Sequence, residues 1–583
     1  MNGGDRIAQV LEKQGVRFLF TLCGGHISPI LVGAKKIGIR VVDVRHEVDA
    51  VFAADAVFRL TGVPGVAAVT AGPGVTNTIT AVKNAQLAQS AVVILGGATA
   101  TLLKGRGALQ DIDQMSLIAP HVKWSAAARA VRELVPLLEE AFREARSGVP
   151  GPVFLECPVD LLYDEELVRT WYAAAGKGGG IAGAATRLYL QRHARKLFSG
   201  AERIQASAPA ADRPRAPEKS DVRRAADLLL KAKKPVLVLG SQVTLATAEV
   251  PELARAVATL GLPVYLAGAA RGLLGAGHTL QLRHKRREAL READLVVLAG
   301  IPADFRLDYG RHIGRKAVLI AVNREEAALR QNRKPELAVH ADPALFLRSL
   351  SERVAAQLAA RPGKTGERWK DWLESLHTRD LEREREIAKQ AEPGPELINP
   401  LLLCREIDRL LAADSVVVAD GGDFVATAAY TVSPRAPLSW LDPGVFGTLG
   451  VGGGFALGAK LCRPEADVWI LYGDGSVAYS LAEFDTFARH GIPVIAVVGN
   501  DAGWTQIARE QVVVLEDDVG TVLARTDYHK VAEGYGGRGL LLERGEDAGP
   551  VLQEAVRIAR GGTAVLVNAH LDKTEFRKGS ISM

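Results

Sequence analysis

The feature that most constrains the fold is a Gly-rich polar turn between two apolar runs late in the chain. Residues 468–472 form the first apolar run, which predicts a buried strand, and 473–476 read Gly-Asp-Gly-Ser. Spaced apolar residues then predict a helix, and a second run at 492–498 predicts another strand. Strand, turn, helix and strand in this order predict a βαβ unit of a parallel sheet. Asp474 and Asn500 therefore follow neighbouring strands, at the edge where open α/β sheets bind ligands.

The chemistry of this turn favours a divalent cation and a diphosphate. The Asp474 carboxylate and the Asn500 amide offer oxygen ligands, and phosphate and water oxygens would complete the octahedron that Mg²⁺ requires. Gly473 and Gly475 let the backbone approach closely, and the amides that open the following helix favour phosphate. A Gly-Asp-Gly turn alone is more often a tight turn with a solvated Asp. It is Asn500, at the end of the next strand, that favours the cation site.

Composition and charge predict an ordinary globular protein of several domains. The 583 residues are too many for one hydrophobic core, which predicts two to four domains. The net charge is +5, from 72 basic and 67 acidic residues, and this balance gives no argument for nucleic acid. The four scattered cysteines lack metal-ligand spacing and predict a reducing compartment. The polar N-terminus is unlike a signal peptide and no apolar stretch approaches about 20 residues, so we expect a cytoplasmic protein without a membrane span.

Three stretches of alternating strand and helix patterns predict an α/β fold with three doubly wound parallel-sheet domains. Apolar runs predict further strands at 18–22, 40–44, 66–70, 91–95, 152–156, 235–239, 263–266, 295–298, 317–320 and 416–418. The expected segments are an α/β domain at 1–165, a linker with an amphipathic helix at 166–217, a second α/β domain at 218–360, a charged linker at 361–395, a third α/β domain at 396–570 and a tail at 571–583. The helix at 187–200 could dock on the protein itself, on a membrane or on a partner.

The combination of the Gly-Asp-Gly turn with Asn500 resembles the cofactor motif of the thiamine-diphosphate enzymes, although Asp501 replaces the second Asn of that motif. Three α/β domains in a row resemble the acetolactate synthase-like branch of these enzymes. Within the branch, the runs most similar to the 2-hydroxyacyl-CoA lyases are 24–29, 423–424, 446–450, 499–506 and 579–581. The resemblance implies a pyrimidine-binding, a central and a diphosphate-binding domain, in that order.

The resemblance also implies which residues bind thiamine diphosphate and Mg²⁺. The implied metal ligands are Asp474, Asn500 and Ala502. The implied cofactor contacts are Gly25, Pro73, Asn77, Gly422, Asp423, Phe424, Gly447, Leu449, Gly473, Gly475, Ser476 and Trp504. Leu449 would fill the space between the two rings of the bent cofactor, or else serve as an ordinary core leucine. Asp423 and Phe424 stand where relatives often have Gln and His, so we expect their turn to act through its backbone.

Three residues of the first domain are the predicted catalytic groups. Glu47 follows the strand at 40–44 and matches the family's Arg-His-Glu, whose Glu shares a proton with the pyrimidine nitrogen and so promotes deprotonation of the thiazolium carbon. His26 and Gln110 are expected on the substrate side, where a His suits carbonyl polarisation or proton transfer. Acetolactate synthases usually have Ala at the position of His26, which favours a different substrate here.

Basic residues of the central domain and of the tail are the predicted substrate contacts. They are Arg271, Arg306, Arg577 and Lys578, which would hold the phosphates of a coenzyme A thioester. The tail resembles a C-terminal lid over the entrance to the site. The central domain would bind ADP or coenzyme A, or else FAD, because 304–306 resembles a synthase segment whose Arg contacts flavin or substrate.

The resemblance implies a carbon–carbon lyase that cleaves 2-hydroxyacyl-CoA to an aldehyde and formyl-CoA, in a reversible acyloin-type condensation. Acetolactate synthase and oxalyl-CoA decarboxylase remain alternatives. A catalytically silent scaffold or regulatory relative is a third, although it would have no physical reason to keep Glu47, Asp474 and Asn500. We expect a homodimer or homotetramer with its active site at the subunit interface. Acyl chain length and physiological direction are not predicted.

Overall fold

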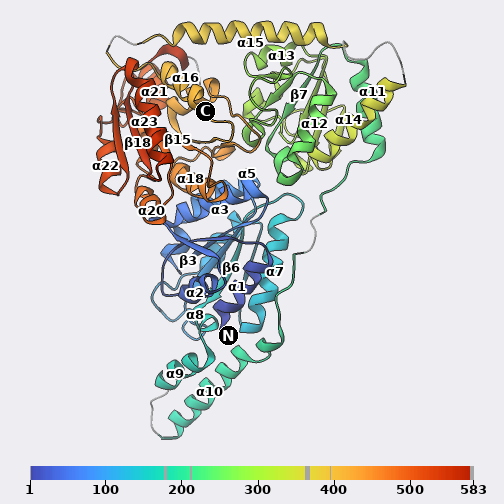
Figure 1. Cartoon of the computed structure of the whole chain (residues 1–583). Helices are drawn as coiled ribbons and strands as arrows, with labels where there is room; N and C mark the ends of the chain where they lie inside the picture. Colours follow the sequence, from blue (N-terminus) through green and yellow to red (C-terminus); the bar gives the residue numbers. More distant parts are fainter. Residues whose placement is uncertain (1, 176–179, 210–212, 361–367, 394–395, 578–583) are drawn as a thin grey trace. The chain divides into compact units, whose positions relative to one another are not determined.

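Three six-stranded parallel sheets, one for each predicted domain, organise the chain (Figure 1). The computed structural model describes residues 2–175, 180–209, 213–360, 368–393 and 396–577. The chain divides into two units, Met1–Phe58 with Val63–Arg213 and Arg59–Gly62 with Pro214–Met583. The predicted fold class, an α/β protein with three parallel-sheet domains, is therefore confirmed.

The first sheet has the strand order β2-β1-β3-β4-β6-β5, and all neighbouring strands are parallel. Its strands are β1 (Phe18–Leu22), β2 (Arg40–Asp43), β3 (Gly65–Val69), β4 (Val92–Ala98), β5 (Trp124–Ala127) and β6 (Val153–Pro158). The α-helices are α1 (Gly3–Lys13), α2 (Ser28–Lys36), α3 (Glu47–Thr61), α4 (Pro73–Thr76), α5 (Ile79–Ala88), α6 (Gln114–Ile118), α7 (Val131–Arg146), α8 (Val159–Leu162), α9 (Glu165–Ala175) and α10 (Gly180–Phe198). Every residue of β3, β4 and β6 is buried, as expected for inner strands of a sheet covered on both faces.

The second unit begins with the central domain, whose strand order is β12-β11-β10-β7-β8-β9. Its strands are β7 (Pro235–Leu239), β8 (Val264–Leu266), β9 (Gln281–Leu282), β10 (Leu295–Ala299), β11 (Val318–Asn323) and β12 (Leu337–His340). The α-helices are α11 (Lys219–Lys231), α12 (Val250–Leu260), α13 (Arg286–Glu292) and α14 (Pro343–Ala359). β7 and β10 are fully buried and form the centre of the sheet.

The third sheet has the order β14-β13-β15-β16-β18-β17. Its strands are β13 (Val416–Asp420), β14 (Trp440–Leu441), β15 (Val468–Gly473), β16 (Ile495–Asn500), β17 (Arg538–Leu542) and β18 (Val565–His570). The α-helices are α16 (Pro400–Leu410), α17 (Gly422–Thr431), α18 (Val451–Cys462), α19 (Asp474–Val477), α20 (Glu483–His490), α21 (Thr505–Leu515), α22 (Tyr528–Gly534) and α23 (Ala548–Arg560). The predicted βαβ unit is therefore present, with β15 and β16 as direct neighbours.

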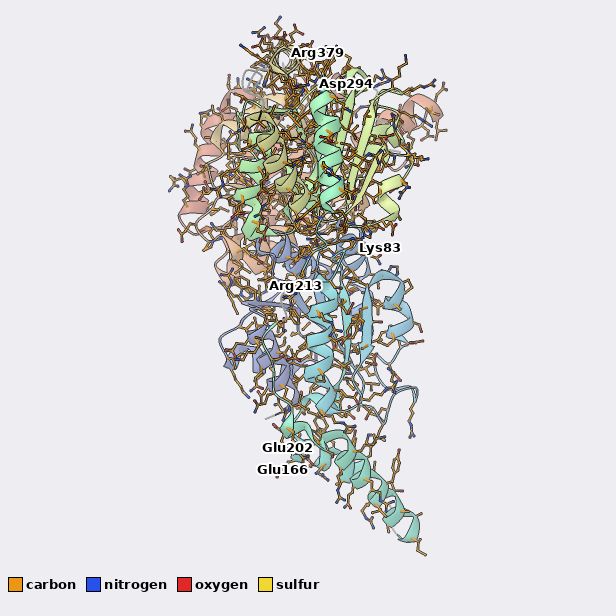
Figure 2. All side chains as sticks on the ribbon, turned by 90° about the vertical axis from the view of Figure 1, so that its right-hand side faces the viewer. Lys83, Glu166, Glu202, Arg213, Asp294 and Arg379 are labelled. Atoms are coloured by element: carbon orange, nitrogen blue, oxygen red, sulfur yellow. The ribbon has the colours of Figure 1, made fainter. Side chains whose placement is uncertain are left out.

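The first predicted linker is more helical than its composition indicated. Residues 173–175 belong to α9, although the Gly- and Ala-rich sequence predicted a flexible segment, and 176–179 lie outside the described residues. α10 begins at Gly180 and is longer than the helix expected at 187–200. In Figure 2, Glu166 marks the start of α9. Only the later part of α10 packs closely on the first unit, because Leu197 is buried whereas Ile181 is 92% exposed.

The charged segment at 361–395 contains a 21-residue helix, α15 (Lys370–Gln390), that packs on the central domain. Trp372 is buried, and its indole N–H donates to the carbonyl of Pro235 at 3.1 Å. Arg379, labelled in Figure 2, pairs with Glu292 at 2.6 Å. These contacts explain how a sequence composed mostly of charged residues forms a helix on a domain surface.

The strands that the apolar runs did not predict lie mostly at sheet edges. They are β5, β9, β12, β14, β17 and β18. Five of these end a sheet, where one side of the strand lacks a partner and polar residues are tolerated. β9 and β14 have only two residues each, too few for a recognisable run. None of the helices in the described part of the chain has the length and apolar character needed to span a membrane.

Candidate functional site

A cavity of about 640 Å³ lies at the carboxyl edge of the third sheet. β15 and β16 are paired with Gly473 opposite Gly499, so Asp474 and Asn500 stand at the ends of adjacent strands. The predicted cofactor contacts that line this cavity are Gly422, Asp423, Phe424, Gly447, Leu449, Gly473, Gly475, Ser476 and Trp504. The structure thus brings together residues from four separate stretches of the third domain around one space.

The three predicted metal ligands are oriented by hydrogen bonds from their own loops. The Asp474 carboxylate accepts from the backbone N–H groups of Gly475 at 2.8 Å and Gly503 at 3.1 Å. The Asn500 side-chain oxygen accepts from the N–H of Ala502 at 3.3 Å. The carbonyl of Ala502 accepts from the N–H of Leu523 at 3.0 Å, which leaves it a second lone pair.

Charge and burial at this edge fit a divalent cation. Burial and the neighbouring carboxylate of Asp501 raise the pKa of Asp474 to about 6. Burial also raises the pKa of Asp501. A bound Mg²⁺ would relieve the repulsion between the two carboxylates and accept the oxygen donors present. In the described part of the chain, no group of three or more His, Cys, Asp or Glu residues is placed to hold a metal.

Two glycines of the cavity wall are needed because large side chains lie against them. A Cβ at Gly475 would lie 2.5 Å from the Trp504 ring. Gly421 has a φ of +67°, and a Cβ there would lie 2.1 Å from Cδ2 of Leu449. Trp504 and Leu449 are therefore packed tightly against the turns that would receive the diphosphate.

Asp420, which sequence reasoning did not select, fixes the loop that carries Leu449. Its fully buried carboxylate accepts from the N–H groups of Gly450 at 2.9 Å and Gly452 at 2.7 Å. Its carbonyl accepts from the Ser476 hydroxyl at 2.5 Å. Burial raises the pKa of Asp420 to about 7, since both hydrogen bonds only partly offset the loss of water. A polar residue at the end of the predicted strand 416–418 was the available signal.

In the first unit, the predicted pyrimidine-side residues lie at the carboxyl ends of β1, β2 and β3. Glu47 begins α3 and is 5% exposed, and Oε2 accepts from the Asn77 amide at 3.0 Å. Nδ1 of His26 lies 3.1 Å from the Thr70 hydroxyl oxygen, and burial lowers the pKa of His26. Gly25 is exposed beside His26, and Pro73 begins α4, four residues before Asn77.

Gln110 lies in the same region because its backbone packs against the turn before α4. A Cβ at Gly72 would lie 2.9 Å from the carbonyl oxygen of Gln110, whose φ is +62°. Gln114, which sequence reasoning missed, joins two strand ends: it donates to the carbonyl of Gly97 at 2.9 Å and accepts from the N–H of Gly72 at 3.3 Å. The loop after β4 therefore contacts the β3 turn at Gln110 and is hydrogen-bonded to it at Gln114.

Comparisons with known proteins identify the three domains of one enzyme family along this chain. The N-terminal and C-terminal thiamine pyrophosphate-binding domains of thiamine pyrophosphate enzymes match residues 1–117 and 420–568, and the central domain of the same enzymes matches 222–350. The chain is 51% identical to 2-hydroxyacyl-CoA lyase 2 of Danio rerio and of Homo sapiens, covering 100% of this chain and 93% and 92% of theirs. The chain belongs to the thiamine pyrophosphate enzyme family. An acetolactate synthase large subunit of Mycobacterium tuberculosis is 34% identical, over 98% of this chain and 96% of its own.

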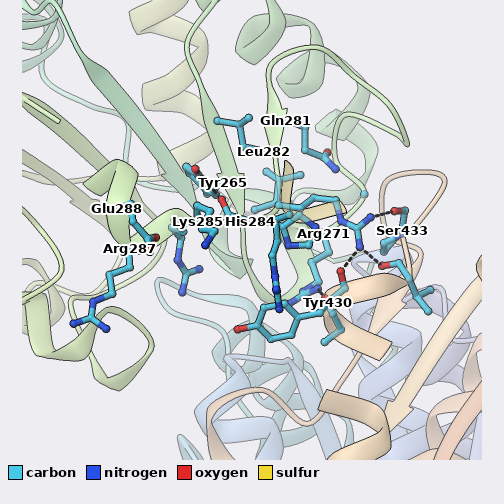
Figure 3. A pocket seen from close by; sticks show the side chains of 18 of the residues that line it. Tyr265, Arg271, Gln281, Leu282, His284, Lys285, Arg287, Glu288, Tyr430 and Ser433 are labelled. Carbon is cyan, nitrogen blue, oxygen red and sulfur yellow. Dashed lines mark hydrogen bonds between the residues drawn. The ribbon is translucent and has the colours of Figure 1, made fainter. Parts of the chain in front are cut away.

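The second unit of this thiamine pyrophosphate enzyme contains another cavity, of about 580 Å³, with a basic lining (Figure 3). The central domain supplies His284, Lys285 and Arg287, and the diphosphate-binding domain supplies Tyr430. α15 completes the wall, because Nε2 of His284 lies 2.7 Å from Oε1 of Glu384. Lys285 and Arg287 are exposed and form no ion pair with any described residue.

Two of the predicted coenzyme A contacts are already engaged in structural interactions. Arg271 lines the basic cavity, but it donates to the carbonyl of Ala429 at 2.8 Å and lies over the Trp440 ring, 5.0 Å from its centroid. Burial lowers the pKa of Arg271. Arg306 pairs with Asp304, with Nη2 2.6 Å from Oδ2. The two side chains therefore hold the surrounding loops, and Lys285 and Arg287 are the cations available to an anion.

The C-terminal segment runs over the wall of the same basic cavity. The Phe576 ring meets Tyr430 edge to face with centroids 6.1 Å apart. The Arg577 guanidinium lies 5.2 Å from the centroid of the Tyr430 ring. Lys578 lies outside the described residues. The described tail is thus anchored on Tyr430, and the lid predicted for it remains a prediction.

Asp423 has a partner that explains how a carboxylate is accommodated beside a phosphate site. Arg509 of α21 donates from Nη1 to Oδ1 at 2.7 Å and from Nη2 to Oδ2 at 2.8 Å. Each side chain is 15% exposed. The Asp423 carboxylate is thus neutralised and held by a planar two-point contact. The Phe424 ring packs against Gly499, and that this turn contacts the cofactor through its backbone stays a prediction.

We expect loss of this ion pair to weaken cofactor binding. Arg509 joins the start of α17 to α21, the helix that follows the predicted metal ligands Asn500 and Ala502. Arg509→Met should lower the affinity for thiamine diphosphate by about tenfold, because it leaves a part-buried carboxylate unpaired. Titration calorimetry of Arg509→Met, Asp423→Asn and the double variant should give a coupling energy of roughly 1–3 kcal/mol. Arg557→Met, which breaks an exposed pair with Glu554, is the control and should have little effect. Additive single effects would contradict the expectation.

Proposed function

We propose that this chain is a thiamine-diphosphate- and Mg²⁺-dependent carbon–carbon lyase that cleaves 2-hydroxyacyl-CoA to an aldehyde and formyl-CoA. The observation that carries the proposal is the 51% identity, over the whole chain, with enzymes named 2-hydroxyacyl-CoA lyase 2. A buried Glu47, an oxygen donor set for Mg²⁺ and a His at position 26 agree with it. The cytoplasmic location, the physiological direction and an ADP, coenzyme A or FAD molecule in the central domain stay predictions.

The third domain would hold the cofactor in place. Thiamine diphosphate, when bound, would supply the electron sink that carbon–carbon cleavage requires. Asp474, Asn500 and the Ala502 carbonyl would hold Mg²⁺ against the diphosphate. Leu449 would press against the cofactor from the loop that Asp420 fixes, so its position is set by two backbone hydrogen bonds.

Residues of the first domain would share and accept the protons that move during the reaction. Glu47, which accepts a hydrogen bond from Asn77, would share a proton with the pyrimidine nitrogen. His26 is suited to act as a base because burial lowers its pKa and favours neutral imidazole. If Nδ1–H donates to the Thr70 hydroxyl oxygen, Nε2 keeps a lone pair that can take the proton of the substrate 2-hydroxyl. Gln110, at the turn before α4, would contact the same substrate group.

The decisive test supplies the purified protein with thiamine diphosphate, Mg²⁺ and either 2-hydroxyacyl-CoA or pyruvate. We expect formyl-CoA and an aldehyde from the first substrate and no acetolactate from the second. Glu47→Gln should lower the rate at least about 100-fold, because it removes the shared proton while keeping the shape. Acetolactate without formyl-CoA would identify a synthase, as the 34% identical relative suggests, and oxalyl-CoA should be tested in parallel. No product from any substrate would favour a silent relative.

We further propose that the basic cavity holds the phosphates of the coenzyme A group. Its support is the pair of exposed cations, Lys285 and Arg287, that form no ion pair with described residues, beside the aromatic side chain of Tyr430. A cavity of about 580 Å³ can admit part of such a ligand.

Lys285→Ala and Arg287→Ala should each raise KM for the acyl-CoA by roughly tenfold with little change in kcat. The reason is that a charge-assisted contact to phosphate contributes to binding before and during the reaction alike. Arg291→Ala is the matched control, since Arg291 is exposed on the same helix but does not line the cavity. Steady-state kinetics measure the effect, and an equal change in the Arg291 variant would contradict the assignment.

The oligomeric state is the last part of the proposal. We propose a homodimer or homotetramer in which Glu47 of one subunit serves the cofactor held by Asp474 of another. Its support is that the pyrimidine-side and diphosphate-side residues belong to separate domains of a thiamine pyrophosphate enzyme.

Mixed dimers of Glu47→Ala and Asp474→Ala chains should therefore recover activity. Each variant alone should be inactive, whereas a mixed dimer would contain one site with both native residues. Differently tagged chains allow the mixed species to be purified and assayed. Verified mixed dimers without any activity would contradict a site shared between subunits.

A further inference from the structure

A further cavity lies at the other end of the carboxyl edge of the first sheet. Its volume is about 610 Å³, within the range of roughly 300–1,000 Å³ typical of small-molecule sites. Residues that follow β4 and β5 line it, together with the end of β6 and part of α10. In the sheet, β3 separates β4, β6 and β5 from β1 and β2, the strands that His26 and Glu47 follow. Of the described residues that line it, none is among those predicted to bind cofactor or substrate.

A buried carboxylate in this cavity lacks part of its hydrogen bonding. Glu156, near the end of β6, is 1% exposed, and its Oε1 accepts from the ammonium group of Lys104. Its Oε2 has no hydrogen-bond partner among the described residues. Leaving a buried polar oxygen unpaired is unfavourable, so a donor that enters the cavity would be stabilised there. Because Lys104 already balances the charge, a neutral donor such as a hydroxyl suits this oxygen.

Two cations at the same cavity have no ion-pair partner among the residues that the structure describes. Arg129 follows β5 and Lys196 lies on α10, and both line the cavity and are exposed. Neither forms an ion pair with any described residue, unlike Lys104. Met115 and Leu197 add apolar surface to the lining. The cavity thus combines anion-binding groups, a short apolar wall and a buried acceptor for a hydroxyl group.

A hydrogen-bond network centred on Asp160 holds the wall of this cavity in place. The hydroxyls of Tyr172 and Thr101 each donate to Oδ2 of Asp160 at 2.5 Å. The Thr101 oxygen also lies 2.9 Å from Nε2 of His193 on α10. Because the Thr101 proton is directed to Asp160, His193 must be the donor in that contact. α9, α10 and the loop after β4 are therefore joined, and the cavity is formed before any ligand binds.

We propose that this cavity binds a small 2-hydroxycarboxylate, whose carboxylate contacts Arg129 and Lys196 and whose hydroxyl donates to Glu156. The site goes beyond the lyase function, since no step of the cleavage uses these residues. Thr101 and Lys104 belong to the same loop as Gln110, which follows β4 and reaches the turn before α4. An occupied cavity would therefore restrain the loop that carries a predicted catalytic residue.

The test measures binding to the full chain saturated with thiamine diphosphate and Mg²⁺. 2-Hydroxybutyrate is titrated by calorimetry, with butyrate as the matched ligand that lacks the hydroxyl. Arg129→Ala and Lys196→Ala should each weaken binding of 2-hydroxybutyrate by about tenfold, as expected for loss of a charge-assisted contact. Arg195→Ala, exposed on the same helix but not lining the cavity, should bind as the wild type does. Butyrate should bind about tenfold more weakly, because Oε2 of Glu156 then stays unpaired.

Three results would overturn the proposal. They are no binding of 2-hydroxybutyrate, equal affinity in the wild type and in both cavity variants, and equal weakening by Arg195→Ala. Equal affinity in the cavity variants would show that the ligand occupies the catalytic site instead.

Hydrogen exchange gives a second readout: 2-hydroxybutyrate should slow exchange in residues 99–113 of the wild type but not of Lys196→Ala. Unchanged exchange in the wild type would overturn the link to the loop. Neither measurement depends on turnover, so both stand apart from the lyase assay.

Discussion

The parallel register between β15 and β16 is the constraint on which the cofactor site depends. Gly473 pairs with Gly499, so the residues that follow them, Asp474 and Asn500, lie at the same edge of the sheet. A slip by one residue would turn each side chain of a strand to the opposite face, so the Asn500 amide would point to the other side of the sheet. The register is secured by β13 and β18 on the outer sides of the pair and by a fully buried apolar core on both strands.

The same edge concentrates carboxylates, and the protein stabilises each in a different way. Asp420 accepts two backbone hydrogen bonds, and Asp423 is bound by Arg509. Asp474 also accepts two backbone hydrogen bonds, but burial and the neighbouring Asp501 raise its pKa, and burial raises the pKa of Asp501. Two neighbouring buried carboxylates repel each other, which is unfavourable for folding and favourable for binding a cation, the usual balance at a functional site. Asp420 and Asp423 shape the cavity, whereas the pair formed by Asp474 and Asp501 is available to a ligand.

The inner strands of the sheets and the strand ends expected to bind the cofactor were predictable from the sequence. The side-chain contacts that fix the loops at these strand ends were not. Inner strands such as β15 are continuous apolar runs, and their ends are marked by glycine and polar residues, so both were recognisable. Edge strands such as β17 lack that signal because their residues are partly exposed. The pairing of Asp423 with Arg509 joins residues far apart in the chain, and no local pattern reports it. For the same reason, the contacts of Arg271 with Ala429 and Trp440 were not visible in the sequence, whereas Asp304, the partner of Arg306, lies only two residues away.

Family membership and substrate choice depend on different parts of this fold. The residues predicted to hold the cofactor lie at strand ends, where the sheet sets their positions. The predicted substrate contacts lie in loops and in the tail, outside the strands, as in the loop after β4 and the segment anchored on Tyr430. The loop after β4 is bound at both of its ends, by Gln114 to the β3 turn and by Thr101 to Asp160. A substitution or a bound ligand at either attachment would shift this loop. It is therefore the part of the first domain where differences in substrate and regulation would arise most readily.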